Sequence, residues 1–238
     1  MIAIIDYGVG NLFSLASSLK SLGLETKVTR DAAAIRAADH IILPGVGAFA
    51  DAMAKLEATG LVPVIKQEVE HKPLLGICLG MQIMVMEYAR NVLGYADANS
   101  SEFTPEGQHN VIDLMPDQQG VETKGGTMRL GKYPCVITPG TKMADCYGTT
   151  EIDERHRHRY EFNNDFRQEM QDAGLVISGT SPDGHLVETV ELPGRDFHLG
   201  AQFHPEFKSR PNRAHPLFKG FIAAALKYCL LYTSDAAD

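Results

Sequence analysis

The sequence of 238 residues contains no tryptophan and only four cysteines, and it lacks a long apolar run. The cysteines, none of them in a Cys-x-x-Cys pair, are Cys78, Cys135, Cys146 and Cys229. This pattern argues against a disulfide framework and against structural zinc. The opening apolar run, Ile2-Ala3-Ile4-Ile5, meets Asp6 after four residues, which is too short for a signal peptide or a membrane span. We therefore expect a cytoplasmic chain with no metal, no cofactor and no membrane contact.

Basic residues are also in the minority, with 22 Lys and Arg against 30 Asp and Glu, giving a net charge of −8. The one basic cluster lies at residues 155–159, so nucleic acid is not expected as a partner. With 44% hydrophobic residues, a chain of this length can bury one sizeable core. We therefore expect a single domain over residues 1–228.

Apolar runs and helical periodicity alternate along the first half of the chain. Strands are expected at 1–6, 26–29, 40–43 and 72–75, and helices at 11–22, 51–57, 62–70 and 81–93. After residue 105 the pattern changes to short strands, near 126–130, 154–162, 175–178, 186–191 and 197–203, followed by a helix at 218–228. The alternation predicts an α/β fold with a mostly parallel central sheet and helices on both faces.

The most informative motif is Gly76-Ile77-Cys78-Leu79-Gly80, which lies between an expected strand and an expected helix. A nucleophile flanked by glycines at this position is typical of a nucleophile elbow, here with sulfur in place of oxygen. The helix amino terminus would favour the thiolate form of Cys78. The alternative is a buried free cysteine in a tight turn.

A second motif, His204-Pro205-Glu206, offers a partner for the cysteine. On an extended segment, side chains two residues apart point to the same face, so Glu206 can orient His204. His204 would then act as the base for Cys78, in the chain order Cys, His, Glu. Alone, His-x-Glu could equally be a solvated strand end.

These residues resemble the class I glutamine amidotransferases, over residues 1 to about 228. The resemblance implies their flavodoxin-like fold and a glutaminase reaction on L-glutamine. In it, Cys78 attacks the side-chain amide, His204 carries protons and Glu206 holds His204. The family's oxyanion strand matches Leu43-Pro44-Gly45-Val46-Gly47-Ala48-Phe49, so the backbone N–H groups of Val46 and Leu79 would face the tetrahedral oxygen. Without the elbow, this glycine-rich run would read as an ordinary turn.

The two ends of the chain resemble different members of this family. Residues 1–83 resemble the glutaminase subunit of imidazole glycerol phosphate synthase, in Ile4-Ile5-Asp6-Tyr7-Gly8-Val9-Gly10-Asn11-Leu12 and the run from Leu43 to Phe49. Residues 84–228 resemble the amidotransferase domain of CTP synthase, in Lys124-Gly125-Gly126-Thr127-Met128-Arg129-Leu130-Gly131 and Glu154-Arg155-His156-Arg157-His158-Arg159-Tyr160-Glu161. Both families share the run from Gly76 to Gln82. We therefore expect a chimeric chain with a join near residues 76–83.

The resemblance also implies how glutamine is held. Glu102 and Arg159 match the residues that bind its amino and carboxylate groups, and Gly45 and Gln82 lie in segments that contact it. An amino acid zwitterion needs one anion and one cation, which agrees with this assignment. The alternatives are a surface loop acid for Glu102 and a solvated or partner-facing strand for Arg159.

These observations leave three functions open. The first is a glutaminase that supplies ammonia to a synthase, as in CTP synthase and pyrimidine biosynthesis. The second is the glutaminase subunit of imidazole glycerol phosphate synthase in histidine biosynthesis, although the Pro-x-Met-Gly-Trp-Asn segment typical of that subunit is absent. The third is an inactive amidotransferase-like binding module. Residues 229–238 resemble translated sequencing adapter, and we expect them to be a non-native tail.

Overall fold

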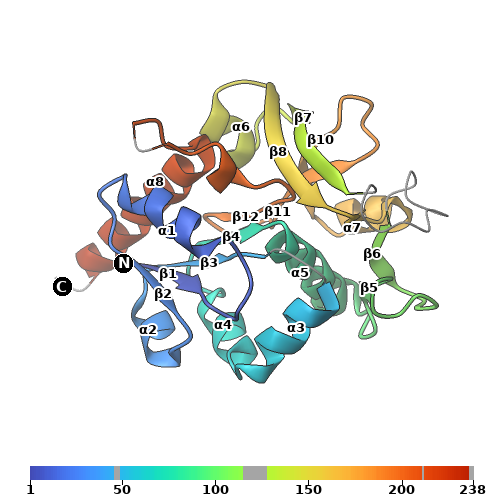
Figure 1. Cartoon of the computed structure of the whole chain (residues 1–238), viewed down its shortest axis with the longest axis horizontal. Helices are drawn as coiled ribbons and strands as arrows, with labels where there is room; N and C mark the ends of the chain where they lie inside the picture. Colours follow the sequence, from blue (N-terminus) through green and yellow to red (C-terminus); the bar gives the residue numbers. More distant parts are fainter. Residues whose placement is uncertain (46–48, 115–127, 211, 236–238) are drawn as a thin grey trace.

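The computed structural model describes residues 1–45, 49–114, 128–210 and 212–235. Its largest element is a nine-stranded sheet with the order β2-β1-β3-β4-β12-β11-β10-β7-β8 (Figure 1). The strands are β1 (Ile2–Ile5), β2 (Thr26–Thr29), β3 (His40–Leu43), β4 (Leu74–Ile77), β7 (Arg129–Ile137), β8 (Glu151–His158), β10 (Val176–Thr180), β11 (Val187–Glu191) and β12 (His198–Ala201). A second sheet contains β5 (Asn99–Ser100), β6 (Asn110–Leu114) and β9 (Tyr160–Phe162).

The large sheet is mixed. The strands β2, β1, β3, β4 and β12 run parallel to one another, whereas β12, β11, β10, β7 and β8 pair in antiparallel fashion. The parallel strands agree with the alternation expected from the sequence. The sequence predicted a mostly parallel sheet, but only half of it is parallel. The strands after residue 105 form a larger antiparallel extension than their short apolar runs had indicated.

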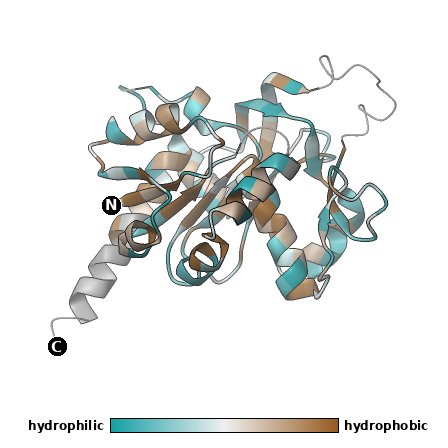
Figure 2. Cartoon of the chain, turned by 60° about the horizontal axis from the view of Figure 1, so that its bottom comes forward, coloured by the Kyte–Doolittle hydropathy of each residue, from teal (hydrophilic) through white to brown (hydrophobic). Residues whose placement is uncertain are grey.

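Helices cover both faces of the sheet (Figure 1). They are α1 (Leu12–Lys20), α2 (Ala32–Ala37), α3 (Phe49–Ala58), α4 (Val62–Glu68), α5 (Leu79–Tyr88), α6 (Lys142–Tyr147), α7 (Arg167–Asp172) and α8 (Pro216–Asp235). Three shorter helical turns are η1 (Ala89–Leu93), η3 (Asn164–Phe166) and η4 (Pro205–Phe207). Figure 2 shows the apolar strands in the centre of the molecule and more polar segments around them. No helix in the described ranges is long and apolar enough to cross a membrane.

The core consists of two apolar layers, one on each face of the sheet. The first joins α2, α3, α4, α5 and α7 to the sheet, and the second joins α1, α6 and α8 to it. Successive residues of one strand enter different layers, as Ile41 and Ile42 do in β3. Both faces are therefore buried, which explains the continuous apolar runs of the parallel strands.

The residues before the expected join pack directly against those after it. The strand β3 pairs with β4, and β4 pairs with β12 in parallel register from Leu74↔His198 to Ile77↔Ala201. The second apolar layer likewise combines Leu15 and Leu19 of α1 with Phe218 and Phe221 of α8. Residues 1–75 thus share one sheet and one core with the remainder of the chain.

Gly80 allows a close contact between α5 and β3. A Cβ atom at this position would lie 2.1 Å from the backbone oxygen of Leu43. Alanine normally favours a helix over glycine by about 1 kcal/mol. Because the clash involves backbone, we expect the opposite sign for Gly80→Ala, a loss of at least about 2 kcal/mol in the free energy of unfolding, measured by urea denaturation.

The control for this prediction is Gly60→Ala. Nothing lies within 4 Å of a Cβ atom at Gly60, where φ is +69°. Only the backbone penalty of about 1 kcal/mol is expected there. Equal losses for the two variants would mean that the contact between α5 and β3 can relax.

Candidate active site

Cys78 lies between β4 and α5, at the carboxyl end of an inner parallel strand. Its backbone has φ 53° and ψ −104°, and it is the one non-glycine residue with positive φ in the described ranges. Such a conformation costs roughly 1–3 kcal/mol and persists when neighbouring contacts fix it. Here the Cys78 N–H donates to the Ala201 oxygen at 2.7 Å, and its carbonyl accepts from the Gln82 N–H at 3.2 Å. The strand, strained turn and helix form the expected elbow geometry.

His204 follows β12 and contacts Glu206. The distance from His204 Nδ1 to Glu206 Oε1 is 2.9 Å, and both side chains are buried. Since a carboxylate only accepts, Nδ1 carries the proton and Nε2 is left for another partner. Within the described residues, Nε2 has no hydrogen bond of regular geometry.

The environment of His204 favours its charged form. Burial lowers the pKa of His204, but the Cys78 sulfur and the Glu206 carboxylate outweigh this effect and raise it above the ordinary value. Cys78 therefore lies close enough to His204 to act on its charge. A thiolate beside an imidazolium is the reactive form of a nucleophilic cysteine.

The contact between His204 and Glu206 arises in a different way from the one expected. The sequence argument placed both side chains on one face of an extended segment. In the structure only His204 is extended, and Pro205–Phe207 form the 3₁₀ turn η4. The turn brings the carboxylate back to the imidazole, so strand alternation was the wrong reason for the pairing.

The described start of the expected oxyanion segment, up to Gly45, lies against the elbow. A Cβ atom at Gly45 would lie 2.2 Å from Leu79 Cβ, so only glycine allows this approach. Leu79 is buried and is the first residue of α5. Val46 lies outside the described residues.

Three of the four expected glutamine-binding residues lie near Tyr160, whereas Gly45 lies against Leu79. Gln82 is buried, and its Nε2 donates to the Tyr160 carbonyl oxygen at 2.8 Å. Glu102 and Arg159 are half-buried. Burial raises the pKa of the Tyr160 hydroxyl, Glu102 raises it further and Arg159 lowers it, so both charges lie near this side chain. The structure therefore gathers Gln82, Glu102 and Arg159 around one short segment.

Sequence reasoning missed Gln202, which is completely buried beside the cysteine. Its Nε2 lies 3.6 Å from Cys78 Sγ, and its Oε1 lies 3.2 Å from Gln82 Nε2. The available signal was its spacing, because Gln202 precedes His204 by two residues at the end of an apolar strand.

A buried ionic cluster lies behind His204. Arg129 Nη1 is 2.6 Å from Glu188 Oε1, and its guanidinium lies 4.5 Å from the centre of the Tyr133 ring. Burial raises the pKa of Glu188 to about 7, although Arg129 opposes this shift. His156 Nε2 is 3.5 Å from Glu188 Oε2, and burial lowers the pKa of His156. The strand β8 thus turns the neutral His156 inward, against an ion pair that β7 and β11 contribute.

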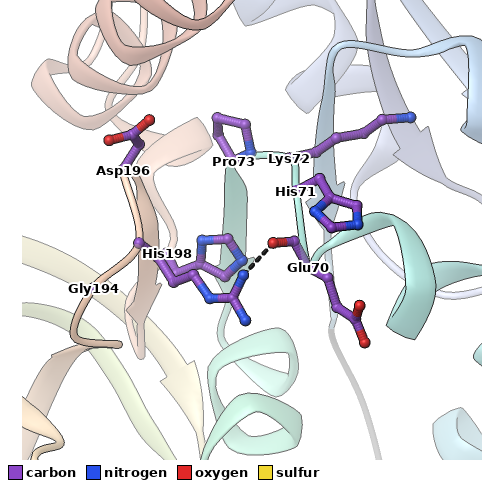
Figure 3. Close-up of a pocket in the computed structure, with 8 residues that line it drawn as sticks. Glu70, His71, Lys72, Pro73, Gly194, Asp196 and His198 are labelled. Atoms are coloured by element: carbon purple, nitrogen blue, oxygen red, sulfur yellow. Dashed lines mark hydrogen bonds between the residues drawn. The ribbon is translucent and has the colours of Figure 1, made fainter.

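A polar cavity of about 180 Å³ lies at the opposite end of the parallel strands. Figure 3 shows Asp196 and His198 on one side of it and Glu70, His71 and Lys72 on the other. These residues precede β4 or flank the start of β12, whereas Cys78 and His204 follow the ends of the same strands. The cavity is therefore separate from the candidate active site. No group of three or more His, Cys, Asp or Glu in the described part of the chain could hold a metal ion.

Residues 3–224 match the family model of glutamine amidotransferase class-I. CTP synthase of Carboxydothermus hydrogenoformans is 57% identical over 190 residues, which cover 79% of this chain and 34% of the relative. CTP synthase of Staphylococcus aureus strain JH9 is 54% identical over 191 residues, which cover 80% and 34%. The chain thus spans about a third of the length of these relatives.

The glutaminase domain of Trypanosoma brucei CTPS, solved with bound acivicin, is a similar structure. It has a TM-score of 0.78 and 32% identity, and the match covers 95% of this chain and 93% of that chain.

The extent of these alignments bears on the expected join. Residues 84–238 make up 155 of the 238 residues, or 65%, so an alignment over 79% of the chain must continue into the first 83 residues. The similarity to CTP synthase therefore begins before residues 76–83, and none of these matches points to a separate origin for residues 1–83. The chain belongs to the class I glutamine amidotransferases and, within that family, to the glutaminase domains of CTP synthases.

Proposed function

We propose that Cys78, His204 and Glu206 hydrolyse L-glutamine to glutamate and ammonia. The observation that carries the proposal is the strained elbow at Cys78 beside an imidazole that Glu206 holds at 2.9 Å. The thiolate attacks the side-chain amide carbon, and the His204 imidazolium protonates the leaving ammonia. The thioester that remains is cleaved by a water molecule, which His204 deprotonates, and glutamate leaves.

The neighbouring residues fit the binding of an amino acid. We assign the glutamine ammonium to Glu102 and its carboxylate to Arg159, because both charges lie near Tyr160. The segment at Gly45 and Val46 and the N–H of Leu79 would hold the tetrahedral oxygen, an interaction worth roughly 3–4 kcal/mol per donor in such sites. Gln82 would line the same pocket.

The ammonia acceptor is the part of a CTP synthase that this chain does not span. Relatives that are 54–57% identical carry the name CTP synthase, which favours CTP formation over imidazole glycerol phosphate synthesis. An inactive binding module is disfavoured by the ordered contact between His204 and Glu206. The chimeric origin and the cytoplasmic location stay predictions from the sequence.

The direct test is ammonia release by the purified chain. We expect L-glutamine to be hydrolysed and L-asparagine, which is one methylene shorter, to be hydrolysed far more slowly. Acivicin, which is bound in the Trypanosoma brucei CTPS glutaminase domain, should inactivate the chain through Cys78. A folded chain that neither releases ammonia nor reacts with acivicin, alone or with the remainder of a CTP synthase, would favour the binding module.

His204→Ala is expected to lower ammonia release by roughly 10⁴-fold or more, because it removes the proton carrier. For Glu206→Ala, the fold-loss in ammonia release should be at least about ten times smaller than for His204→Ala, since the imidazole remains. Glu206→Gln is the matched control, because its amide oxygen can still accept from Nδ1. Initial rates with saturating glutamine measure all three, and equal losses for His204→Ala and Glu206→Ala would give Glu206 more than an orienting role.

A further inference from the structure

Gln202 contacts the reacting sulfur of the proposed glutaminase. Its side chain is completely buried between the end of β12 and the elbow, and its Nε2 lies 3.6 Å from Cys78 Sγ. The backbone N–H of Gln202 donates to the backbone carbonyl oxygen of Glu188 at 2.8 Å, which fixes the position of the residue. The side chain is therefore held in place beside the nucleophile.

The direction of the hydrogen bonds is set by the backbone of Tyr160. A carbonyl oxygen only accepts, so the group of Gln82 that lies 2.8 Å from the Tyr160 oxygen must be its amino group. The same amino group lies 3.2 Å from the Gln202 side chain, which must present its oxygen there. The Gln202 amino group is then the one that faces Cys78 Sγ. The direction of each hydrogen bond in this relay, which runs from Tyr160 through Gln82 and Gln202 to Cys78, therefore follows from the contacts.

We propose that Gln202 is a further catalytic residue, which donates a hydrogen bond to the Cys78 thiolate, and that Gln82 is the positioning residue that orients it. This inference rests on the proposed glutaminase function, in which the thiolate is the nucleophile. A buried thiolate is stabilised by a donor, because burial alone favours the neutral thiol. Cys135 shows how strong burial is: its pKa is raised by burial and by the carboxylates of Glu188 and Glu154, although Arg129 and a backbone hydrogen bond from Thr180 oppose this shift.

The relay also connects the nucleophile to the substrate site. Tyr160, which accepts from Gln82, follows Arg159, the residue assigned to the glutamine carboxylate. A shift of this segment when glutamine binds would change the hydrogen bond that reaches Cys78. Gln82 would thus act on the sulfur through Gln202 as well as line the pocket.

The test is the pH dependence of Cys78 alkylation by iodoacetamide in the free protein, followed by the mass of the Cys78 peptide. For Gln202→Met, which keeps the side-chain length but cannot donate, we expect the alkylation midpoint to rise by about one pH unit. Alkylation well below the midpoint should then slow about tenfold. Circular dichroism and thermal melting establish that the variant is folded. An unchanged midpoint in the folded variant would overturn the proposal.

A second variant, Gln82→Met, decides the question if Gln202→Met does not fold. It leaves Gln202 without its orienting donor and introduces no charge, so a smaller rise of the midpoint is expected, in the same direction. The matched control is Gln168→Met, because the Gln168 amide bonds to Asp172 on α7 and its loss should leave the midpoint unchanged. A Gln82→Met midpoint equal to that of the control would mean that no relay operates.

Alkylation requires no glutamine, so the outcomes separate the two proposals. A chain that releases no ammonia but shows the expected midpoint rises would reject the glutaminase function and retain the hydrogen bond to Cys78. A chain that hydrolyses glutamine but shows no midpoint change in the variants would retain the glutaminase function and reject the hydrogen bond to Cys78.

Discussion

Replacement of Cys78 by alanine is expected to lower ammonia release from L-glutamine by at least roughly 10⁴-fold. No other described cysteine has a strained elbow, a helix amino terminus and an imidazole beside it. The variant should also lose covalent labelling by a glutamine analogue that carries a chloroketone or diazo group. Ammonia release and the mass of the labelled protein measure the two effects.

Cys135→Ala and Cys146→Ala are the matched controls for this prediction. Burial raises the pKa of the Cys135 thiol, and burial with Glu191 and Asp145 nearby raises that of Cys146 to about 12. Both thiols should stay neutral and unreactive near pH 7, so these variants should keep the activity and the label. Labelling that persists at Cys135 or Cys146 in Cys78→Ala would contradict the assignment of the nucleophile.

The parallel half of the fold could be predicted because its inner strands β1, β3 and β4 are buried on both faces, whereas the edge strand β2 exposes Lys27 and Val28. The expected strands at 26–29 and 40–43 coincide with β2 and β3. The short helices α2 and α6 were missed, since each has six residues and buries only one or two side chains, such as Ile35 or Met143. Helices of this length derive their stability from tertiary packing, which leaves little periodicity in the sequence.

The site could be predicted where a local motif determines the geometry. The elbow at Cys78 follows from its flanking glycines, because both allow close backbone approaches that a Cβ atom would block. The buried ion pair of Arg129 and Glu188 could not be foreseen, since these residues lie on β7 and β11 and meet only after folding. Gln202 was missed for the same reason, because its partners Gln82 and Cys78 are 120 and 124 residues away.

Buried histidines should make the folded chain sensitive to acid. Burial lowers the pKa of His40 and of His198 to about 4, and that of His158 to about 3. In the unfolded chain these groups titrate near 6.5. As the pH falls below 6.5, these histidines become protonated in the unfolded state but stay neutral in the folded state, so the free energy of unfolding decreases.

We expect the free energy of unfolding to fall by about 5 kcal/mol between pH 7 and pH 5. At pH 5 each of these three histidines, and the buried His156 whose pKa is also lowered, contributes a loss of about 2 kcal/mol. Glu188 acts in the opposite sense, because burial raises its pKa to about 7, so the folded state gains a proton that the unfolded chain binds only near 4.5. This gain offsets about one histidine, and His204, whose pKa is raised to about 10, offsets about 1 kcal/mol more because it is already protonated in the folded chain. The net loss is a large part of the roughly 5–15 kcal/mol that stabilises a typical domain, and urea denaturation at the two pH values measures it.

The double variant His40→Gln/His198→Gln tests whether buried histidines cause this loss of stability, because both residues lie away from Cys78. His40 packs edge-on against Phe221, with ring centres 5.5 Å apart, and the His198 Nε2–H donates to the Val69 oxygen at 2.7 Å. Glutamine can replace the polar contact but does not titrate, so the double variant should lose stability more gradually between pH 7 and pH 5, whatever its stability at pH 7. The control is the pair His71→Gln and His185→Gln, two exposed residues whose loss should leave the slope unchanged. If the His40 and His198 variant keeps the slope of the parent chain, acid sensitivity must arise elsewhere, and the buried histidines would have to accept protons without unfolding.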